Sequence, residues 1–211
     1  MLGLIVRVPI ACWRKGHARD YLESEPLPPP STCYGFLLAL VGEENRRRHI
    51  GARVTAGILV AGHTSVVLRT LWRVKSKGVP QGVGGNARPD FQQLVVGSML
   101  TMWVDRGDES GERPCLEERV RSALADPSTI SRFGGLSLGE STHLVDSVNA
   151  IKDEVPMAEN FVVATRGRLT LPVWVDHVGT ANTRHVVGDL VTSRRPDPAL
   201  LPTIAPPNPD H

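Results

Sequence analysis

The chain has 211 residues, of which 41% are hydrophobic and 22% charged, and its formal net charge at pH 7 is +2. This composition is that of an ordinary soluble globular protein, and the length allows a proper core in one large or two small domains. No apolar run reaches the roughly 18 to 20 residues that a membrane-spanning helix needs, and Arg7 and Pro9 interrupt the apolar start that a signal peptide would require. The three cysteines are too few and too scattered for a disulfide framework or a zinc site, so we expect a cytoplasmic protein without membrane contact, metal or other cofactor.

The first predicted elements are a strand, a loop and a buried helix. Apolar residues alternate along residues 2–11 with the period of two that a β-strand requires. After a loop over residues 13–30, the sequence LPPPSTCYGFLLALVG runs from three prolines, which suit neither a helix interior nor a central strand, into an apolar segment. We predict that Ser31 is the N-cap of a buried helix, whose apolar residues begin at Tyr34 and which ends at Gly42.

Two further strands are predicted over residues 53–60 and 65–74, joined by a turn at residues 61–64. In the second of these strands the even-numbered apolar residues from Val66 onward share one face, and the cations from Arg69 onward share the other face. We therefore expect a strand with one core side and one basic side.

Residues 75–90 contain four glycines and two prolines without an apolar period, and they predict a long mobile excursion. A strand over residues 94–104 and a helix that begins at Pro114 follow. The resulting order of strands and helices resembles the split β-α-β arrangement of ferredoxin-like folds. From about residue 143 short strands alternate with tight turns, and the tail over residues 196–211, with six prolines, is expected to be extended or disordered. The short strands are predicted over residues 161–165, 168–174 and 184–191.

Charge is distributed unevenly along the chain. Residues 1–90 hold 13 Lys and Arg against 6 Asp and Glu, a net charge of +7, whereas residues 91–211 hold 11 against 16, a net charge of −5. A basic half joined to an acidic half suggests one face for a polyanion. For the cluster Arg46–His49, which follows the first predicted helix, we favour a solvated helix end, and contact with phosphates is the alternative.

Ser137 stands in a G-x-S-x-G sequence that is typical of the nucleophile elbow of serine hydrolases. Such an enzyme needs the serine on a sharp strand-to-helix turn, an oxyanion loop upstream and alternating parallel βα units. The sequence has neither an HGGG-type loop before Ser137 nor those units, so a glycine-rich turn is favoured and a small serine hydrolase is the alternative. His177 and His185 have no third ligand at a suitable spacing, so no metal site is predicted.

Three stretches, taken in order, resemble one protein family. They are the strand that ends at Trp13-Arg14 together with PPPSTCYGFLLALVG, the sequence RPDFQQLVVGSMLTMWVD, and the turn SRFGGLSLGESTHLVDSV. In this order they resemble the fifth family of CRISPR-associated (Cas) proteins, and they are closest to its DevS-like (MYXAN-type) branch. The resemblance covers about residues 1–150.

This resemblance implies an α+β fold, in which residues 1–150 form a ferredoxin-like (RRM-like) domain with a protruding thumb loop or hairpin at about residues 75–93. A small β-rich C-terminal part over residues 151–195 and the proline-rich tail would follow. The resemblance also implies a subunit of a type I Cascade surveillance complex, which holds the 5′ handle of the crRNA and caps the backbone filament. The implied partners are the crRNA handle, the backbone subunit, the large subunit and target DNA near the PAM.

A branch of this family cleaves precursor RNA with Tyr, Lys and His side chains, but this chain has only Tyr21 and Tyr34 as tyrosines, and no matching triad can be placed. We therefore expect a non-catalytic subunit. A generic RRM-like RNA-binding protein is a further alternative, which would carry interleaved aromatic residues, whereas aromatic residues are 5% of this chain. The basic strand face and the glycine-rich excursion suit an RNA backbone and splayed bases. The residues expected to bind RNA are Arg14, Lys15, Ser31, Arg69, Arg73, Lys75, Lys77, Gln81, Arg88, Phe91, Gly134 and Gly135.

Overall fold

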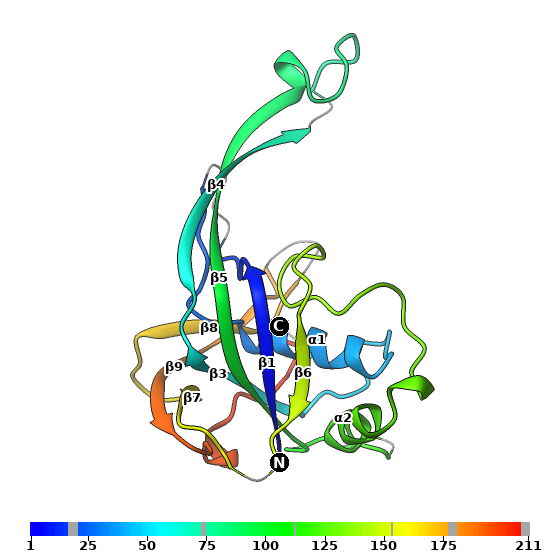
Figure 1. Cartoon of the computed structure of the whole chain (residues 1–211), viewed down its shortest axis with the longest axis vertical. Helices are drawn as coiled ribbons and strands as arrows, with labels where there is room; N and C mark the ends of the chain where they lie inside the picture. The colour runs from blue at the N-terminus through cyan, green and yellow to red at the C-terminus, as the bar shows by residue number, and fades with distance from the viewer. Residues whose placement is uncertain (17–20, 73–74, 112, 153, 177–180, 208–211) are drawn as a thin grey trace.

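The computed structural model describes residues 1–16, 21–72, 75–111, 113–152, 154–176 and 181–207, with residues 70–72 described by their backbone. In this part of the chain nine strands form one sheet, and two α-helices pack against it (Figure 1). The fold is therefore α+β, as the sequence predicted. Within the same residues, none of the helices is both long and apolar enough to cross a membrane. The elements are β1 (Leu2–Ala11), β2 (Tyr21–Leu22), α1 (Pro30–Leu40), β3 (Arg53–Val60), β4 (His63–Trp72), β5 (Ala87–Asp105), α2 (Leu116–Ala125), β6 (Ser147–Ala150), β7 (Ala158–Val163), β8 (Leu169–Trp174) and β9 (Arg184–Ser193), with short 3-10 turns η1 (Gly84–Asn86), η2 (Pro127–Thr129) and η3 (Pro198–Leu200).

The 19-residue strand β5 connects two parts of the molecule. Its second half pairs with β1 on one side and with β3 on the other, both antiparallel. Its first half pairs with β4, from His63 opposite Val96 to Trp72 opposite Ala87, and with the short β2. Because β3 and β4 follow one another along the same edge of β5, β4 prolongs the sheet beyond the body. The β4–β5 hairpin, residues 63–96, projects from the rest of the chain and is called the projecting hairpin below (Figure 1).

Two glycines lie where the projecting hairpin leaves the body. Gly97 has a φ of 75°, a backbone conformation that side-chain-bearing residues rarely adopt. Across the ladder, Gly62 separates β3 from β4, and a Cβ there would lie 2.5 Å from the Ser98 hydroxyl oxygen. Gly62 therefore permits a close approach of the strands at this junction, and Gly97 permits the unusual backbone conformation.

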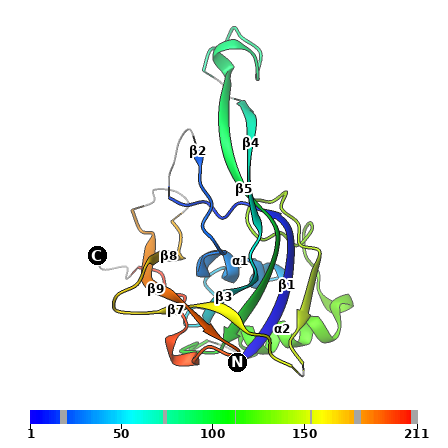
Figure 2. The same ribbon diagram turned by 60° about the vertical axis from the view of Figure 1, so that its left-hand side comes forward.

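The core lies between the sheet and the two helices. The body strands run in the order β6-β1-β5-β3, and the sheet continues through β7-β9-β8. Helix α1 follows β1, helix α2 follows β5, and Figure 2 shows both on the same side of these strands. The apolar period of β1 is the reason, since every second side chain points toward the helices. Leu4, Val6, Leu37, Leu100 and Met102 are each at most 1% exposed.

Helix α1 begins earlier than the sequence predicted. Pro29 is its N-cap and Pro30 its first residue, a position where the missing N–H of proline removes no helical hydrogen bond. Ser31 therefore lies inside the first turn, and its side chain makes no capping hydrogen bond. The prediction that Ser31 is the N-cap was wrong.

The excursion predicted over residues 75–90 is more ordered than expected. Strand β5 begins at Ala87 rather than at Leu94, because residues 87–93 form hydrogen bonds with β4. The charged residues and the proline in this stretch gave no sign of a strand. The tip folds around the buried side chain of Asn86, whose Oδ1 accepts from the backbone N–H groups of Lys75 and Ser76 at 2.7 and 2.9 Å. A short segment of the excursion is thus held by one amide.

The core side predicted for β4 is absent in the structure. Val66 and Leu68, expected on the core side, are 49% and 64% exposed, and Val67 on the Arg69 face is 37% exposed as well. Arg69, expected on a free basic face, is 26% exposed and forms ion pairs with Asp90 and Glu140. The alternation was read correctly, but β4 leaves the body and pairs only with β5 among the described strands, so its apolar face remains uncovered.

The C-terminal strands join the same sheet, because Gly57 and Ile58 of β3 pair with β7. The tail also packs against the body, contrary to the expectation of an extended or disordered segment. Leu201 and Ile204 are 2% and 0% exposed, and the Ile204 N–H donates to the Ala52 carbonyl at 2.8 Å. Residues 208–211 lie outside the described part of the chain.

A buried asparagine joins the body to the C-terminal strands. Asn160 Oδ1 accepts from Thr101 Oγ1 and Trp103 Nε1, each at 2.9 Å. Its Nδ2 donates to the carbonyl oxygen of Ser193 at 3.0 Å. A Cβ at Gly57 would lie 2.3 Å from this Oδ1, so the glycine leaves room for the amide. One side chain thus connects β5, β7 and the end of β9.

We predict that Asn160→Val lowers the free energy of unfolding by about 2–4 kcal/mol, because it leaves the buried donors of Thr101 and Trp103 without an acceptor. Valine itself suits a strand, so the loss reports the hydrogen bonds. Urea unfolding measures the change. Asn149→Val in β6 is the matched control, since Asn149 is exposed, and it should change stability by less than about 0.5 kcal/mol. Equal losses for the two variants would contradict the role given to Asn160.

Candidate nucleic-acid interface

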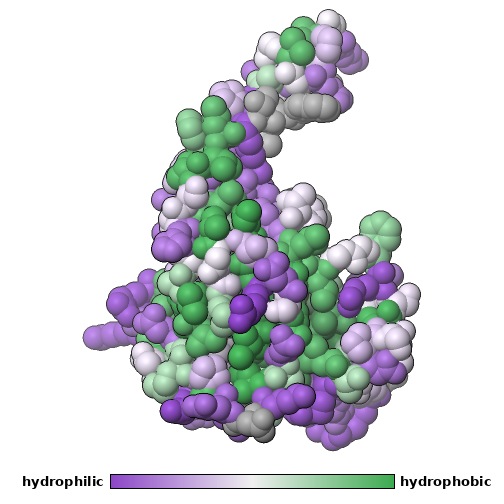
Figure 3. Space-filling model, in the orientation of Figure 1, coloured by the Kyte–Doolittle hydropathy of each residue, from purple (hydrophilic) through white to green (hydrophobic). Residues whose placement is uncertain are grey.

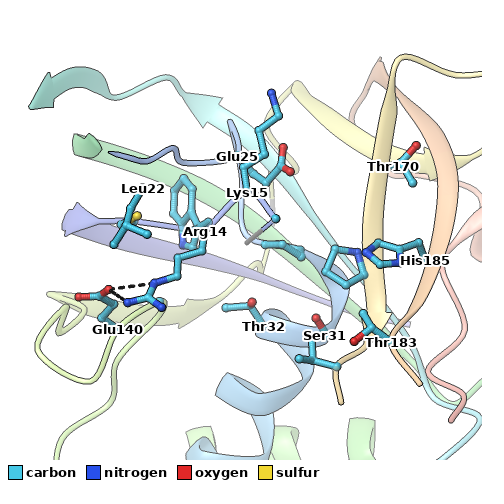
Figure 4. Close-up of a pocket in the computed structure, with 17 residues that line it drawn as sticks. Arg14, Lys15, Leu22, Glu25, Ser31, Thr32, Glu140, Thr170, Thr183 and His185 are labelled. Atoms are coloured by element: carbon cyan, nitrogen blue, oxygen red, sulfur yellow. Dashed lines mark hydrogen bonds and ion pairs between the residues drawn. The ribbon is translucent and has the colours of Figure 1, made fainter. Parts of the chain in front are cut away.

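A groove of about 1010 Å³ opens between the N-terminal end of α1, the loop after β1 and the strands β8 and β9 (Figure 4). The loop contributes Arg14 and Lys15, whose side chains are 56% and 59% exposed, and the helix contributes Ser31. The structure thus brings together three residues that the sequence predicted separately. Other polar lining residues were missed, because no pattern in the sequence connects the C-terminal strands with α1. These are Glu25, Thr32, Glu140, Thr170, Thr183 and His185.

The N-terminal end of α1 points the positive end of its dipole toward this groove, whose charged lining residues are Arg14, Lys15, Glu25 and Glu140. The proline run fixes the direction of the helix, and its first turn contains no acidic residue that would offset the helix dipole. Ser31 Oγ is buried and has no hydrogen-bond partner in the described part of the chain. The N–H groups of Thr32 and Cys33 donate to the Pro29 carbonyl at 2.9 and 3.0 Å and Pro30 has none, so this end contributes mainly its dipole, beside the cations Arg14 and Lys15.

Glu140 lies between two arginines at the base of the projecting hairpin. Its Oε1 accepts from Nε and Nη2 of Arg14 at 3.3 and 2.9 Å, and its Oε2 accepts from Nη1 of Arg69 at 3.4 Å. Arg69 Nη2 also donates to the buried Asp90 at 3.4 Å. Burial alone would raise the pKa of Glu140, but the hydrogen bond from Arg14 and the charges of both arginines outweigh it, so the pKa is lowered. Glu140 is therefore ionised at neutral pH.

His143 connects the glycine-rich turn before β6 to the end of β1 by hydrogen bonds. Its Nδ1 accepts from the backbone N–H of Cys12 at 3.2 Å and from that of Glu140 at 3.3 Å. Burial lowers the pKa of His143, and the charge of Glu140 opposes this while that of Arg69 reinforces it. The ring is therefore neutral, with its proton on Nε2. The buried Trp13 also links the end of β1 to this turn, because its Nε1 donates to the Leu138 carbonyl at 3.2 Å.

Ser137 does not have the surroundings of a nucleophile elbow. It forms an isolated β-bridge with Leu144, and the chain then enters β6, whereas an elbow passes directly from a strand into a helix. His143 is occupied by the two backbone donors described above. Among the described residues, His, Cys, Asp and Glu side chains form no group of three or more placed to bind a metal ion.

The other predicted RNA-binding residues are distributed over two places. Lys75, Lys77 and Gln81 are exposed at the tip of the projecting hairpin, and Arg88 is half-buried there, whereas Arg73 lies outside the described residues. Gly134 and Gly135 are exposed in the turn before β6, beside the fully exposed Phe133.

Phe91 belongs to an apolar face of the projecting hairpin. It is 49% exposed and lies opposite Leu68, which is 64% exposed, and Val66 and Tyr21 are also exposed nearby in the ladder. Figure 3 shows hydrophobic surface along the stalk of this hairpin. We call Tyr21, Val66, Leu68 and Phe91 the apolar hairpin face.

Within the cluster Arg46–His49, Arg46 and His49 are packed, whereas Arg47 and Arg48 are exposed. The Arg46 guanidinium lies 3.8 Å from the ring centroid of Trp174, and it donates to the Val175 carbonyl at 2.9 Å. His49 is buried against Glu109, with 2.7 Å between Nδ1 and Oε2. The favoured prediction of a solvated helix end therefore agrees with Arg47 and Arg48 but was wrong for Arg46 and His49, whose partners lie far away in the sequence.

Comparison with known proteins gives a close relative in sequence and several solved structures of similar fold, two of which are described below. No family model matches the chain. The CRISPR-associated protein Cas5 of Myxococcus xanthus (strain DK1622) is 52% identical to it over 192 residues, which are 90% of this chain and 90% of the relative. A chain of a CRISPR RNA-guided surveillance complex has a TM-score of 0.59 at 15% identity, covering 97% of this chain and 91% of its own. A structure described as a Cas protein has a TM-score of 0.52 at 16% identity, covering 90% and 94%. These two neighbours support the fold alone.

The neutral state of His143 predicts that the protein loses stability in mild acid. An unfolded histidine has a pKa of about 6.5, and the folded pKa is lower, so unfolding takes up a proton between these two values. The contribution is fully present above about pH 6.5 and decreases below it, by at most about 1.4 kcal/mol per pH unit. Urea unfolding between about pH 7.5 and pH 5.5 measures this. His143→Asn keeps an acceptor near the Nδ1 position without titrating, so its stability should depend less on pH; identical slopes would refute the assignment.

Proposed function

The chain belongs to the Cas5 family of CRISPR-associated proteins, and we propose that it is the subunit of a type I Cascade surveillance complex that binds the 5′ handle of the crRNA and caps the backbone filament. Family membership confirms the resemblance that the three sequence stretches indicated. The 52% identity to the Myxococcus xanthus Cas5 over 90% of both chains carries the proposal. The groove and the projecting hairpin supply surfaces that suit such a role.

We propose a ferredoxin-like arrangement for residues 1–150. The order β6-β1-β5-β3, with one helix after β1 and another after β5, supports this reading. In this proposal the projecting hairpin is the thumb, residues 151–195 are the small β-rich part, and the remainder is the tail.

The proposed path of the RNA crosses the groove and reaches the projecting hairpin. Arg14, Lys15 and the N-terminal end of α1 would bind the backbone, because they bring two exposed cations beside the positive end of a helix dipole. Across the groove, Thr170, Thr183 and His185 offer hydrogen-bonding groups that suit base edges (Figure 4). Single-stranded RNA is commonly bound with its bases splayed out, and a groove of this size can hold such a base.

The apolar hairpin face is proposed as the contact with a neighbouring Cascade subunit. Exposed contiguous apolar surface on a soluble protein marks interaction sites, and these four residues come from three adjacent strands. The backbone subunit and the large subunit are the proposed partners, together with target DNA near the PAM, in the cytoplasm. The subunit itself is proposed to be non-catalytic, in keeping with the bridge that Ser137 forms with Leu144.

Co-expression with the other subunits and a guide, followed by sequencing of the bound RNA, tests the function. We predict that replacing Lys75, Lys77 and Arg88 together by alanine weakens guide retention, with the salt slope reduced by roughly one for each lost phosphate contact. Guide retained after washes of increasing salt measures this. The control replaces Arg113 and Arg121, exposed on and beside α2, and should retain guide as the wild type does. A complex that assembles but contains no crRNA would refute the proposed function.

The apolar hairpin face generates a separate prediction about assembly. Leu68→Ser with Phe91→Ser should reduce self-association of the isolated chain, because it removes exposed apolar area, and should also reduce incorporation into the co-expressed complex. Size-exclusion chromatography measures both effects. Val187→Ser with Val191→Ser, which changes two exposed apolar residues of β9, is the matched control and should assemble normally. Normal assembly of the hairpin variant would show that this face does not contact a subunit.

A further inference from the structure

We infer that Arg14 and Arg69 together form a subsite for one phosphodiester group of RNA, and that the carboxylate of Glu140 occupies this subsite in the RNA-free chain. The inference rests on the proposed function, which gives the groove a single-stranded RNA ligand without assigning any individual phosphate.

The first support is that one carboxylate joins two arginines from separate elements. Arg14 follows β1, Arg69 belongs to β4, and Glu140 belongs to the turn before β6. Each carboxylate oxygen accepts from a different guanidinium. A phosphodiester also has two terminal oxygens, and arginine binds carboxylates and phosphates with the same forked geometry. The two guanidinium groups are therefore already placed to share one anion.

The second support is that the carboxylate satisfies this pair incompletely. Arg69 contacts both Glu140 and Asp90 at 3.4 Å, which is longer than the about 2.7–2.9 Å of good charge-assisted hydrogen bonds. Arg69 Nε and Asp90 Oδ1 are buried without a hydrogen-bond partner in the described part of the chain. Buried polar groups are nearly always paired, so the unmade bond at Arg69 Nε shows that the two carboxylates do not satisfy this guanidinium fully. A tetrahedral phosphate supplies more acceptor directions than a planar carboxylate.

The third support is access. Arg14 and Glu140 both line the groove, and Figure 4 shows their pairing at its edge. The Glu140 side chain is 24% exposed, so it can turn to solvent when a phosphate enters. The turn itself need not move, because the Glu140 backbone N–H remains bonded to His143.

The charges of the cluster predict how Glu140 affects the affinity for RNA. Arg14 and Arg69 carry two positive charges, and Glu140 and Asp90 carry two negative charges, so the cluster is neutral in the free chain. An RNA phosphate must compete with Glu140 for the arginines, and part of its binding energy is lost in the exchange. Removal of the carboxylate charge should therefore strengthen RNA binding.

The test is fluorescence anisotropy of the full chain with a labelled oligouridine of about twelve nucleotides, which reports phosphate contacts without base preference. Glu140→Gln should bind several-fold more tightly than the wild type at about 50 mM salt, and this advantage should shrink roughly threefold by about 200 mM, as one added phosphate contact requires. Glu140→Ala should do the same. Arg14→Ala combined with Glu140→Gln should lose the gain.

Asp108→Asn is the matched control, because it frees Arg53 from an ion pair of 3.1 Å at the opposite end of β5. It should bind as the wild type does, and an equal gain would mean that net charge alone is responsible and would overturn the inference. Unchanged or weaker binding by both Glu140 variants, whose folding is checked by thermal unfolding, would also overturn it. In that case a loss in the Lys75, Lys77 and Arg88 variant would leave the proposed function standing, whereas a wild-type chain and complex that bind no RNA would refute the function itself.

Discussion

The continuous hydrogen bonding of β5 is the constraint on which the rest of the structure depends. Its second half is the central strand of the body, and its first half is one side of the projecting hairpin. A shift of β5 by one residue would turn Leu100 and Met102 away from the helices and would also turn Phe91 to the opposite hairpin face. The packing of the core therefore decides which surface the hairpin presents to its surroundings, although the two lie far apart along the strand.

The candidate interface is assembled around the end of β1. The loop after β1 brings Arg14 to the groove, while Trp13 and Cys12, its neighbours, hold the glycine-rich turn through Leu138 and His143. The same turn carries Glu140 back to Arg14 and Arg69. Cations that would attract a polyanion are thus paired internally and positioned by buried hydrogen bonds. The charge of the interface is set by these pairs rather than by the net charge of the basic half of the sequence.

Local patterns predicted much of the body, and distant partners account for the errors. The period of two in β1 and the apolar character of α1 are properties of adjacent residues, so both elements could be predicted. The alternation in β4 identified two faces. Whether a face is covered depends on the position of β4 outside the body, which cannot be predicted from the residues of the strand. Arg46 stacks on Trp174, and the donors to Asn160 stand on β5, so neither environment is visible in the neighbouring sequence.

The glycines at positions 62 and 97 separate two parts of the sheet whose strands are held in place by different partners. In the body the register of β5 is fixed by the helices and the neighbouring strands. In the projecting hairpin the register of β4 and β5 is fixed chiefly by their pairing with each other. Insertion of two residues into each strand near the tip would preserve the alternation of faces and would lengthen the hairpin by about 7 Å. The length of the projecting hairpin can therefore vary during evolution without any change in the core that supports it.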